Sequence, residues 1–148
     1  MAEIDRSVIG QWGPEATMVV ELGKVREFAR AVKDPNPAFS AGERPLAPPT
    51  FLMSMAHWIG DLGATRQGIK LDYRRLLHGE QEFEYLKPIR VGDVLRFRSR
   101  TKDVFEKQGK RGGTMTFVVG ETEFRNQDGD VVAYLRNVAI ETADAVAS

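Results

Sequence analysis

The residues best suited to acid–base chemistry lie in one short segment, Asp34-Pro35-Asn36-Pro37-Ala38-Phe39. A carboxylate held in a turn can take a proton from a reacting group or give one to it. The chain has two histidines, His57 and His78, and no cysteine, which excludes thiolate catalysis, disulfides and cysteine-bound metals. Because the possible ligands are not clustered, we expect neither a metal site nor a cofactor.

A predicted amphipathic helix leads into this segment. Its apolar residues recur at helical spacing, and charged residues occupy the other face; the apolar ones are Leu22, Val25, Phe28, Ala29 and Val32. The helix must end near Lys33, because Pro35 and Pro37 follow and a residue before proline avoids helical backbone. Asp34 therefore has two possible roles, a catalytic carboxylate or the start of an Asx turn. Asn36 sets the turn under either interpretation.

A second helix is predicted over Thr50–Leu62, with Thr50 as its cap or first-turn residue. The segment is apolar on most faces, which is typical of a buried helix. Gly60 or Gly63 can end it. His57 lies inside it, where a satisfied core histidine is expected more often than a catalytic one.

From about Leu76 the apolar pattern changes to a period of two, which predicts strands. Four long strands are expected, near 82–85, 95–100, 114–125 and 131–140, after a first strand near 17–21. One sheet packed on one hydrophobic helix gives an α+β domain spanning residues 1–148. His78 precedes Gly79 at the start of the first long strand and is either a second catalytic group or part of a structural turn.

Charge and hydropathy indicate which partners and which cellular compartment to expect. The chain has 21 basic and 21 acidic residues, which argues against nucleic-acid binding through bulk charge. No apolar run approaches the roughly 20 residues needed to cross a membrane. Residues 1–7 lack the apolar core of a secretory signal, so a cytoplasmic protein is expected.

Several motifs in this order resemble the MaoC-like acyl-thioester dehydratases. The Asp34–Phe39 segment resembles their hydratase motif, which runs aspartate, any residue, asparagine, proline, an apolar residue, histidine. Ala47-Pro48-Pro49-Thr50-Phe51 stands where that family begins its central helix, and Pro88–Asp93 resembles its turn before the third strand. With His78-Gly79-Glu80-Gln81, these elements look most like the N-terminal-type branch, the FAS1-type dehydratases. The resemblance implies a hot-dog fold, an antiparallel sheet wrapped around a central hydrophobic helix.

The resemblance also implies an activity. Members interconvert an (R)-3-hydroxyacyl thioester, of CoA or of acyl-carrier protein, with its trans-2-enoyl form. An aspartate and a histidine act on the water as general acid and base, and a backbone N–H at the start of the central helix holds the thioester oxygen. Such a donor stabilises developing charge because it is already oriented.

The chain departs from the family pattern at two positions. Asp34 matches the catalytic aspartate, but Phe39 stands where the histidine belongs and cannot carry a proton. Pro49 falls where active members place a glycine, and proline has no N–H. The resemblance also implies that Asn36, Phe39, Pro49 and Thr50 contact the substrate.

The two departures point to the dyad-less subunit of a heterodimeric 3-hydroxyacyl-thioester dehydratase, which shapes the acyl channel beside a catalytic hot-dog subunit. A homodimer remains open as well. One alternative is a self-sufficient hydratase that uses Asp34, with His78 as its second group. Another is a non-catalytic protein that binds acyl thioesters or serves as a scaffold.

The row Arg96, Arg98 and Arg100 also has two interpretations, a clamp for the phosphates of coenzyme A or a solvated strand face. A hairpin between 76–85 and the next strand would pair these arginines with Glu80, Glu82 and Glu84. The hot-dog topology instead places the strand after the helix at a sheet edge, away from its successor. We expect that topology, with the two sets of charges on separate faces.

Overall fold

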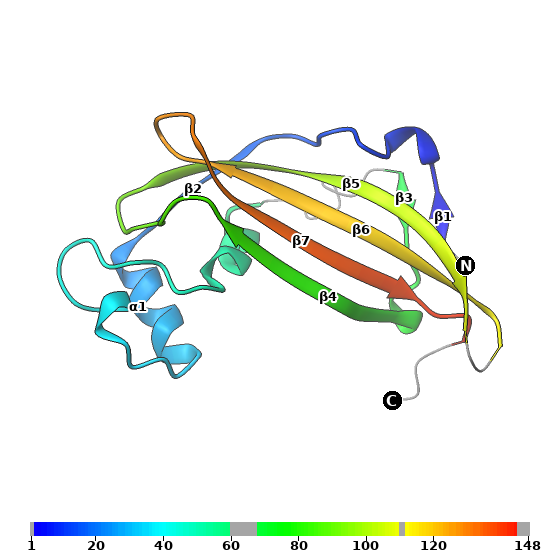
Figure 1. Cartoon of the computed structure of the whole chain (residues 1–148), viewed down its shortest axis with the longest axis horizontal. Coiled ribbons are helices and arrows are strands. Elements are labelled where there is room, and N and C mark those ends of the chain that lie inside the picture. The colour runs from blue at the N-terminus through cyan, green and yellow to red at the C-terminus, as the bar shows by residue number, and fades with distance from the viewer. Residues whose placement is uncertain (1, 60–67, 110–111, 145–148) are drawn as a thin grey trace.

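The computed structural model describes residues 2–59, 68–109 and 112–144, and its main element is a five-stranded antiparallel sheet (Figure 1). The strand order is β2-β5-β6-β7-β4. The strands are β2 (Ala16–Val19), β4 (Leu76–Tyr85), β5 (Val94–Gln108), β6 (Thr114–Arg125) and β7 (Val131–Glu141). The four long strands are as expected, and β5 extends well beyond its predicted end.

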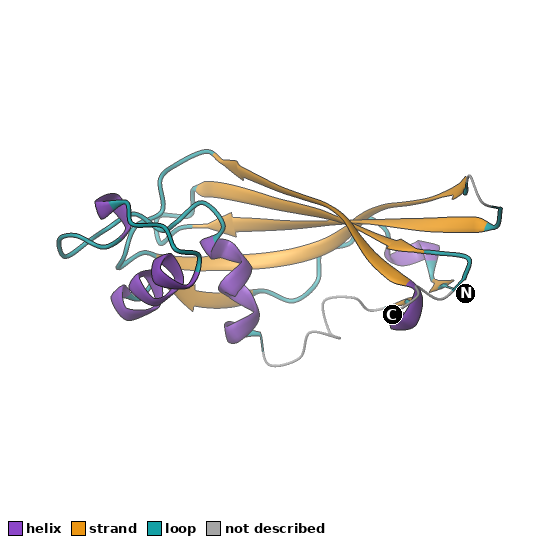
Figure 2. Ribbon diagram, turned by 90° about the horizontal axis from the view of Figure 1, so that it is seen from below, coloured by secondary structure: helices purple, strands orange, loops and turns teal. Residues whose placement is uncertain are grey.

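The helices lie at one end of this sheet. They are α1 (Leu22–Ala31), the short 3-10 turn η2 (Pro37–Phe39) and the 3-10 helix η3 (Phe51–Trp58). Figure 2 shows α1 and η3 on the same side of the twisted sheet. The strands are long and alternate in side-chain direction, so one face of the sheet packs on η3 and the other faces away. We call these the inner and the outer face.

The core forms between η3 and the inner face. Phe51 and Leu52 of η3 are fully buried against Phe97, Phe124 and Leu135 of the sheet. The rings of Phe97 and Phe124 stack with centroids 5.4 Å apart. A smaller apolar cluster of Ile69, Val104 and Val118 fills the other end of the sheet. The predicted architecture, one sheet on one hydrophobic helix, is confirmed.

Small elements close that other end. These are β1 (Glu3–Ile4), which pairs with β3 (Ile69–Lys70), and the 3-10 turns η1 (Arg6–Val8) and η5 (Tyr73–Arg75). The chain from Gly10 to Gly13 then follows β5, because Gly10 N donates to Thr101 O and Gly13 N to Ser99 O, each at 2.8 Å.

The edge position of β4 confirms the hot-dog topology and excludes the hairpin. β4 pairs with β7 along its whole length, with Leu76 opposite Glu141 and Tyr85 opposite Ala133. Its successor β5 lies at the far side of the sheet, between β2 and β6.

The second helix differs from its prediction. It is a 3-10 helix that ends at Trp58, whereas the sequence predicted Thr50–Leu62, and the predicted stops Gly60 and Gly63 lie outside the described residues. Only one of its faces meets the sheet, so Met53 and His57 are exposed. The prediction that His57 is a core residue is therefore wrong. Among the described residues, no helix is long and apolar enough to cross a membrane.

Candidate functional site

The Asp34–Phe39 segment forms two successive side-chain turns. Lys33 closes α1 with a left-handed backbone, φ 57°. Asp34 Oδ1 accepts a hydrogen bond from Asn36 N at 3.0 Å, and Asn36 Oδ1 accepts one from Ala38 N at 3.0 Å, which caps η2. Both side chains thus take up the structural role that the sequence allowed for them. One oxygen of the candidate catalytic carboxylate is directed at its own backbone.

Backbone hydrogen bonds join this segment to the start of η3. Leu46 N donates to Ala38 O at 2.8 Å, and Ala47 N donates to Ile89 O at 2.9 Å. Phe39 is half-buried beside this connection. The chain then enters η3 through buried Pro48 and exposed Pro49. The segment resembling the hydratase motif and the start of the central helix therefore belong to one region of the fold.

The start of η3 is held by a residue that the sequence did not single out. Tyr85, the last residue of β4, donates its hydroxyl to Pro49 O at 2.5 Å. Burial raises the pKa of this phenol to about 12, so it stays a neutral donor. Pro49 itself offers no N–H, and the Thr50 side chain makes no capping hydrogen bond. No sequence signal marks Tyr85, because Pro49 lies 36 positions away from it.

His78 lies at the opposite end of β4 from this region. It is exposed, next to a bulge in β4, opposite Ala139. His78 and Tyr85 are seven positions apart in one strand, which corresponds to about 23 Å. Figure 1 shows the same separation, with β4 starting far from α1 and ending near it. One chain therefore does not bring His78 to the Pro49 turn that Tyr85 holds.

A cavity of about 730 Å³ opens between η3 and the inner face of the sheet. Its apolar walls include Met55 of η3, Ile59 directly after η3, and Val118 and Ala139 of β6 and β7. Ser99 and Thr122 contribute hydroxyls that hydrogen-bond to each other at 2.7 Å. A mostly apolar space with a few polar groups is typical of a site for a small organic ligand.

Gly120 lies in the wall of this cavity, and its lack of a side chain leaves room for Asn137. A Cβ at Gly120 would lie 2.5 Å from Asn137 Oδ1, so any larger residue would displace that amide. The sequence contains a signal for this residue, since a glycine inside a strand often marks a close approach. The other lining residues have no such signal, because the order of β5, β6 and β7 decides which side chains meet.

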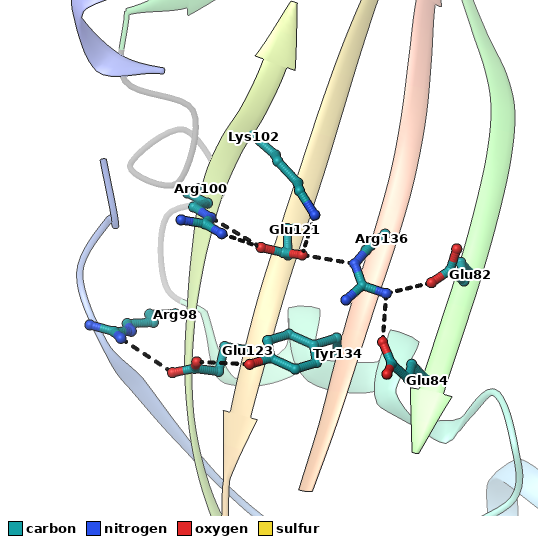
Figure 3. Close-up of polar contacts among 9 residues, drawn as sticks. All are labelled: Glu82, Glu84, Arg98, Arg100, Lys102, Glu121, Glu123, Tyr134 and Arg136. Atoms are coloured by element: carbon teal, nitrogen blue, oxygen red, sulfur yellow. Dashed lines mark hydrogen bonds and ion pairs between the residues drawn. The ribbon is translucent and has the colours of Figure 1, made fainter. Parts of the chain in front are cut away.

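The outer face has a chain of ion pairs (Figure 3). Glu121, only 3% exposed, accepts hydrogen bonds from Arg100 at 2.6 Å, Lys102 at 3.0 Å and Arg136 at 2.7 Å. Burial alone would raise the pKa of Glu121, but these three donors together lower it to about 2. The carboxylate is therefore ionised at neutral pH.

These contacts bear on two predictions, the role of the arginine row and the faces on which the charges lie. Arg96 pairs with Glu15, Arg98 with Glu123 and Arg100 with Glu121. All three arginines therefore have carboxylate partners, and this favours a structural role over a phosphate clamp. The prediction that the arginines and the glutamates of β4 mark separate faces is wrong. Arg136 bridges Glu121 to Glu82 and Glu84, which puts all these charges on the outer face (Figure 3).

A family profile and relatives of similar sequence both match most of this chain. The profile of the FAS1-like dehydratase domain region matches residues 7–135. The chain is 31% identical over 151 residues to a UPF0336 protein of Streptomyces coelicolor, which covers 96% of this chain and 99% of the relative. It is 32% identical over 152 residues to a UPF0336 protein of Saccharopolyspora erythraea, with 96% and 94% covered.

Solved structures agree with the sequence relatives. The C-terminally truncated HadBC complex of Mycobacterium tuberculosis, a (3R)-hydroxyacyl-ACP dehydratase, contains a chain with a TM-score of 0.73 and 26% identity, over 93% of this chain and 98% of that one. The (R)-hydratase of A. caviae has the same fold, with a TM-score of 0.61 at 21% identity, over 91% and 98%. The chain therefore belongs to the FAS1-like dehydratase-region family and has the MaoC-like hot-dog fold.

Proposed function

We propose that this chain is a subunit of an (R)-specific enoyl-thioester hydratase, equivalently a 3-hydroxyacyl-thioester dehydratase, and that it forms the acyl channel beside a catalytic hot-dog subunit. The observation that carries the proposal is the combination of a cavity of about 730 Å³ with an incomplete dyad. Asp34 is tied into an Asx turn by its Oδ1, and Phe39 takes the position of the histidine.

The cavity supports a role in holding the acyl chain. Its walls combine apolar side chains from η3 with those of the inner sheet face, and a hydrocarbon chain gains free energy from such surroundings in proportion to the area it buries. The Ser99 and Thr122 hydroxyls hydrogen-bond to each other, which lowers the cost of placing an apolar ligand beside them.

The chemistry would come from the partner. Addition of water to an enoyl thioester needs one group that takes a proton from water and one that delivers a proton to carbon. In this chain only Asp34 stands at a matching position, and His78 lies at the other end of β4. A second hot-dog subunit with an intact aspartate–histidine pair would complete the site. The HadBC complex is an assembly of two different subunits, which favours this arrangement.

The test is hydration of crotonyl-CoA by the purified chain, alone and after mixing with a candidate partner. The best candidate is a short hot-dog chain that has an intact aspartate–histidine motif and is encoded beside this one. We expect no turnover by the chain alone and clear turnover by the mixture. Normal turnover by the chain alone, lost on Asp34→Asn, would instead establish the self-sufficient hydratase. Tight acyl-CoA binding without turnover in either sample would establish a binding protein.

A further inference from the structure

A row of polar side chains crosses the inner face between its two apolar clusters. Phe97, Phe124 and Leu135 belong to the cluster under η3, whereas Val104 and Val118 belong to the cluster at the other end of the sheet. Side chains alternate along each strand, so the inner positions between these clusters carry polar side chains on all four long strands. We call these residues the polar belt, and they are Ser99 and Thr101 of β5, Thr122 of β6, Asn137 of β7 and Gln81 of β4. A core that only had to exclude water would have apolar residues there.

The strand register gathers the belt around Gly120. This glycine lies opposite Thr101 of β5 and opposite Asn137 of β7, so the two polar residues flank a position without a side chain. Two strand spacings separate their backbones, which corresponds to about 10 Å. The Asn137 carboxamide leans into this gap, because its Oδ1 lies 2.5 Å from the place of a Cβ at Gly120. All three residues line the cavity.

Two members of the belt have no hydrogen-bond partner. The Ser99 and Thr122 hydroxyls bond to each other at 2.7 Å, and Gln81 Nε2 donates to a backbone oxygen of β7 at 3.0 Å. Within the part of the chain that the structure describes, neither the Asn137 carboxamide nor the Thr101 hydroxyl makes a hydrogen bond. A carboxamide offers both donors and an acceptor. The gap over Gly120 therefore presents unpaired polar groups to a ligand in the cavity.

Such groups discriminate between ligands. A purely alkyl chain in the cavity would displace water from the carboxamide and the hydroxyl without replacing its hydrogen bonds, which costs affinity. A chain with a hydroxyl or keto group at this depth would replace them. A site that hydrogen-bonds a polar group of its substrate rejects the analogue without that group far more strongly than an apolar pocket rejects a change of one methylene.

We propose that Asn137, assisted by Thr101, makes this cavity selective for acyl chains that carry a hydroxyl or keto group remote from the reacting carbons. The reacting end must reach a partner subunit, whereas the belt lies in the middle of the sheet. Gln81 of the belt is four positions from Tyr85, about 13 Å along β4 from the strand end that holds the Pro49 turn. This inference rests on the proposed function for the presence of an acyl chain, and it adds the substrate class.

Binding of acyl-CoA thioesters to the full chain tests the proposal. Isothermal titration calorimetry compares lauroyl-CoA with a series of hydroxylauroyl-CoA isomers that differ in the position of the hydroxyl. We expect the best isomer to bind about tenfold more tightly than lauroyl-CoA, since it gains hydrogen bonds that the alkyl chain lacks. In Asn137→Leu, which has a similar shape but no polar atom, this preference should disappear. Because the carboxamide has no partner, the substitution should not lower the melting temperature.

Gln81→Leu is the matched control. It removes an amide from the same belt, but Gln81 is not among the described residues that line the cavity, and its amide already donates to β7. The preference for the hydroxylated chain should persist in this variant. Thr101→Val covers the case in which Asn137→Leu does not fold. It removes the hydroxyl at nearly constant shape and should reduce the preference by about threefold.

Four results would overturn the proposal. They are equal binding of lauroyl-CoA and every isomer, a preference that survives in Asn137→Leu, absence of acyl-CoA binding, and weaker binding of CoA itself in Asn137→Leu. The last result would show that the carboxamide contacts the pantetheine arm and not the acyl chain. These readouts are dissociation constants. A failure of the proposed function would appear as absent hydration in the partner mixture, so the two failures are distinguishable.

Discussion

Asp34 and Asn36 both direct a side-chain oxygen at the backbone N–H two residues ahead, so each is a turn-forming residue before any chemistry is considered. The sequence allowed this role and a catalytic one for Asp34, and the turn alone does not separate them. Tyr85 could not be predicted, since its contact with Pro49 depends on where the end of β4 meets the start of η3.

The turn gives a stability prediction. Asp34→Ala removes the acceptor for Asn36 N and should lower the free energy of unfolding by about 1 kcal/mol. Asp34→Asn keeps a side-chain oxygen at the same place and should lower it by much less. Urea denaturation of the two variants beside the wild type measures both. Equal losses in the two variants would contradict a turn-forming role.

Glu121 gives a pH prediction. Its folded pKa of about 2 lies below the ordinary value of 4.5, so its ion pairs contribute fully above about pH 4.5 and are lost as pH falls towards 2. The shift corresponds to a stabilisation on the order of 3 kcal/mol at neutral pH. The difference in unfolding free energy between the wild type and Glu121→Gln should therefore narrow steadily between pH 5 and pH 3. A pH-independent difference would show that the ion pairs are not its source.

Elements were predicted better than their contacts. Alternation of apolar residues predicted the long strands, because a half-buried strand shows its pattern locally. The length of η3 was overpredicted, since an apolar sequence does not reveal that Met53 and His57 remain on an exposed face. The edge position of β4 came from the family resemblance, and the local pattern favoured a hairpin. Strand order depends on long-range pairing, which periodicity does not encode.

One pair of substitutions on β7 can test whether the cavity holds the acyl chain. Ala139 faces the cavity, whereas its neighbour Val138 pairs with Val119 on the alternate face. With the partner subunit present, Ala139→Phe should reduce turnover of long-chain enoyl thioesters by about tenfold or more and spare crotonyl-CoA. Val138→Phe is the control and should leave the ratio of the two rates unchanged. Equal loss for both chain lengths in Ala139→Phe would place the acyl chain elsewhere.

The chain as a whole has the MaoC-like hot-dog fold, and we propose that a second subunit completes its site. In this proposal, Phe39 and Pro49 stand where the family pattern has a histidine and a glycine, and they supply neither a proton carrier nor an N–H donor. The inner face offers a cavity. These properties fit a division of labour in which one subunit binds the acyl chain and the other performs the proton transfers.

The turnover number of the two-subunit complex with Asp34→Asn in this chain shows which subunit performs the proton transfers. Asparagine cannot act as a general base but preserves the turn. We predict a turnover number equal to that of the unsubstituted complex, with the aspartate of the partner as the essential one. A fall of about a hundredfold or more, the size expected for loss of a general base, would show that this chain performs the chemistry itself.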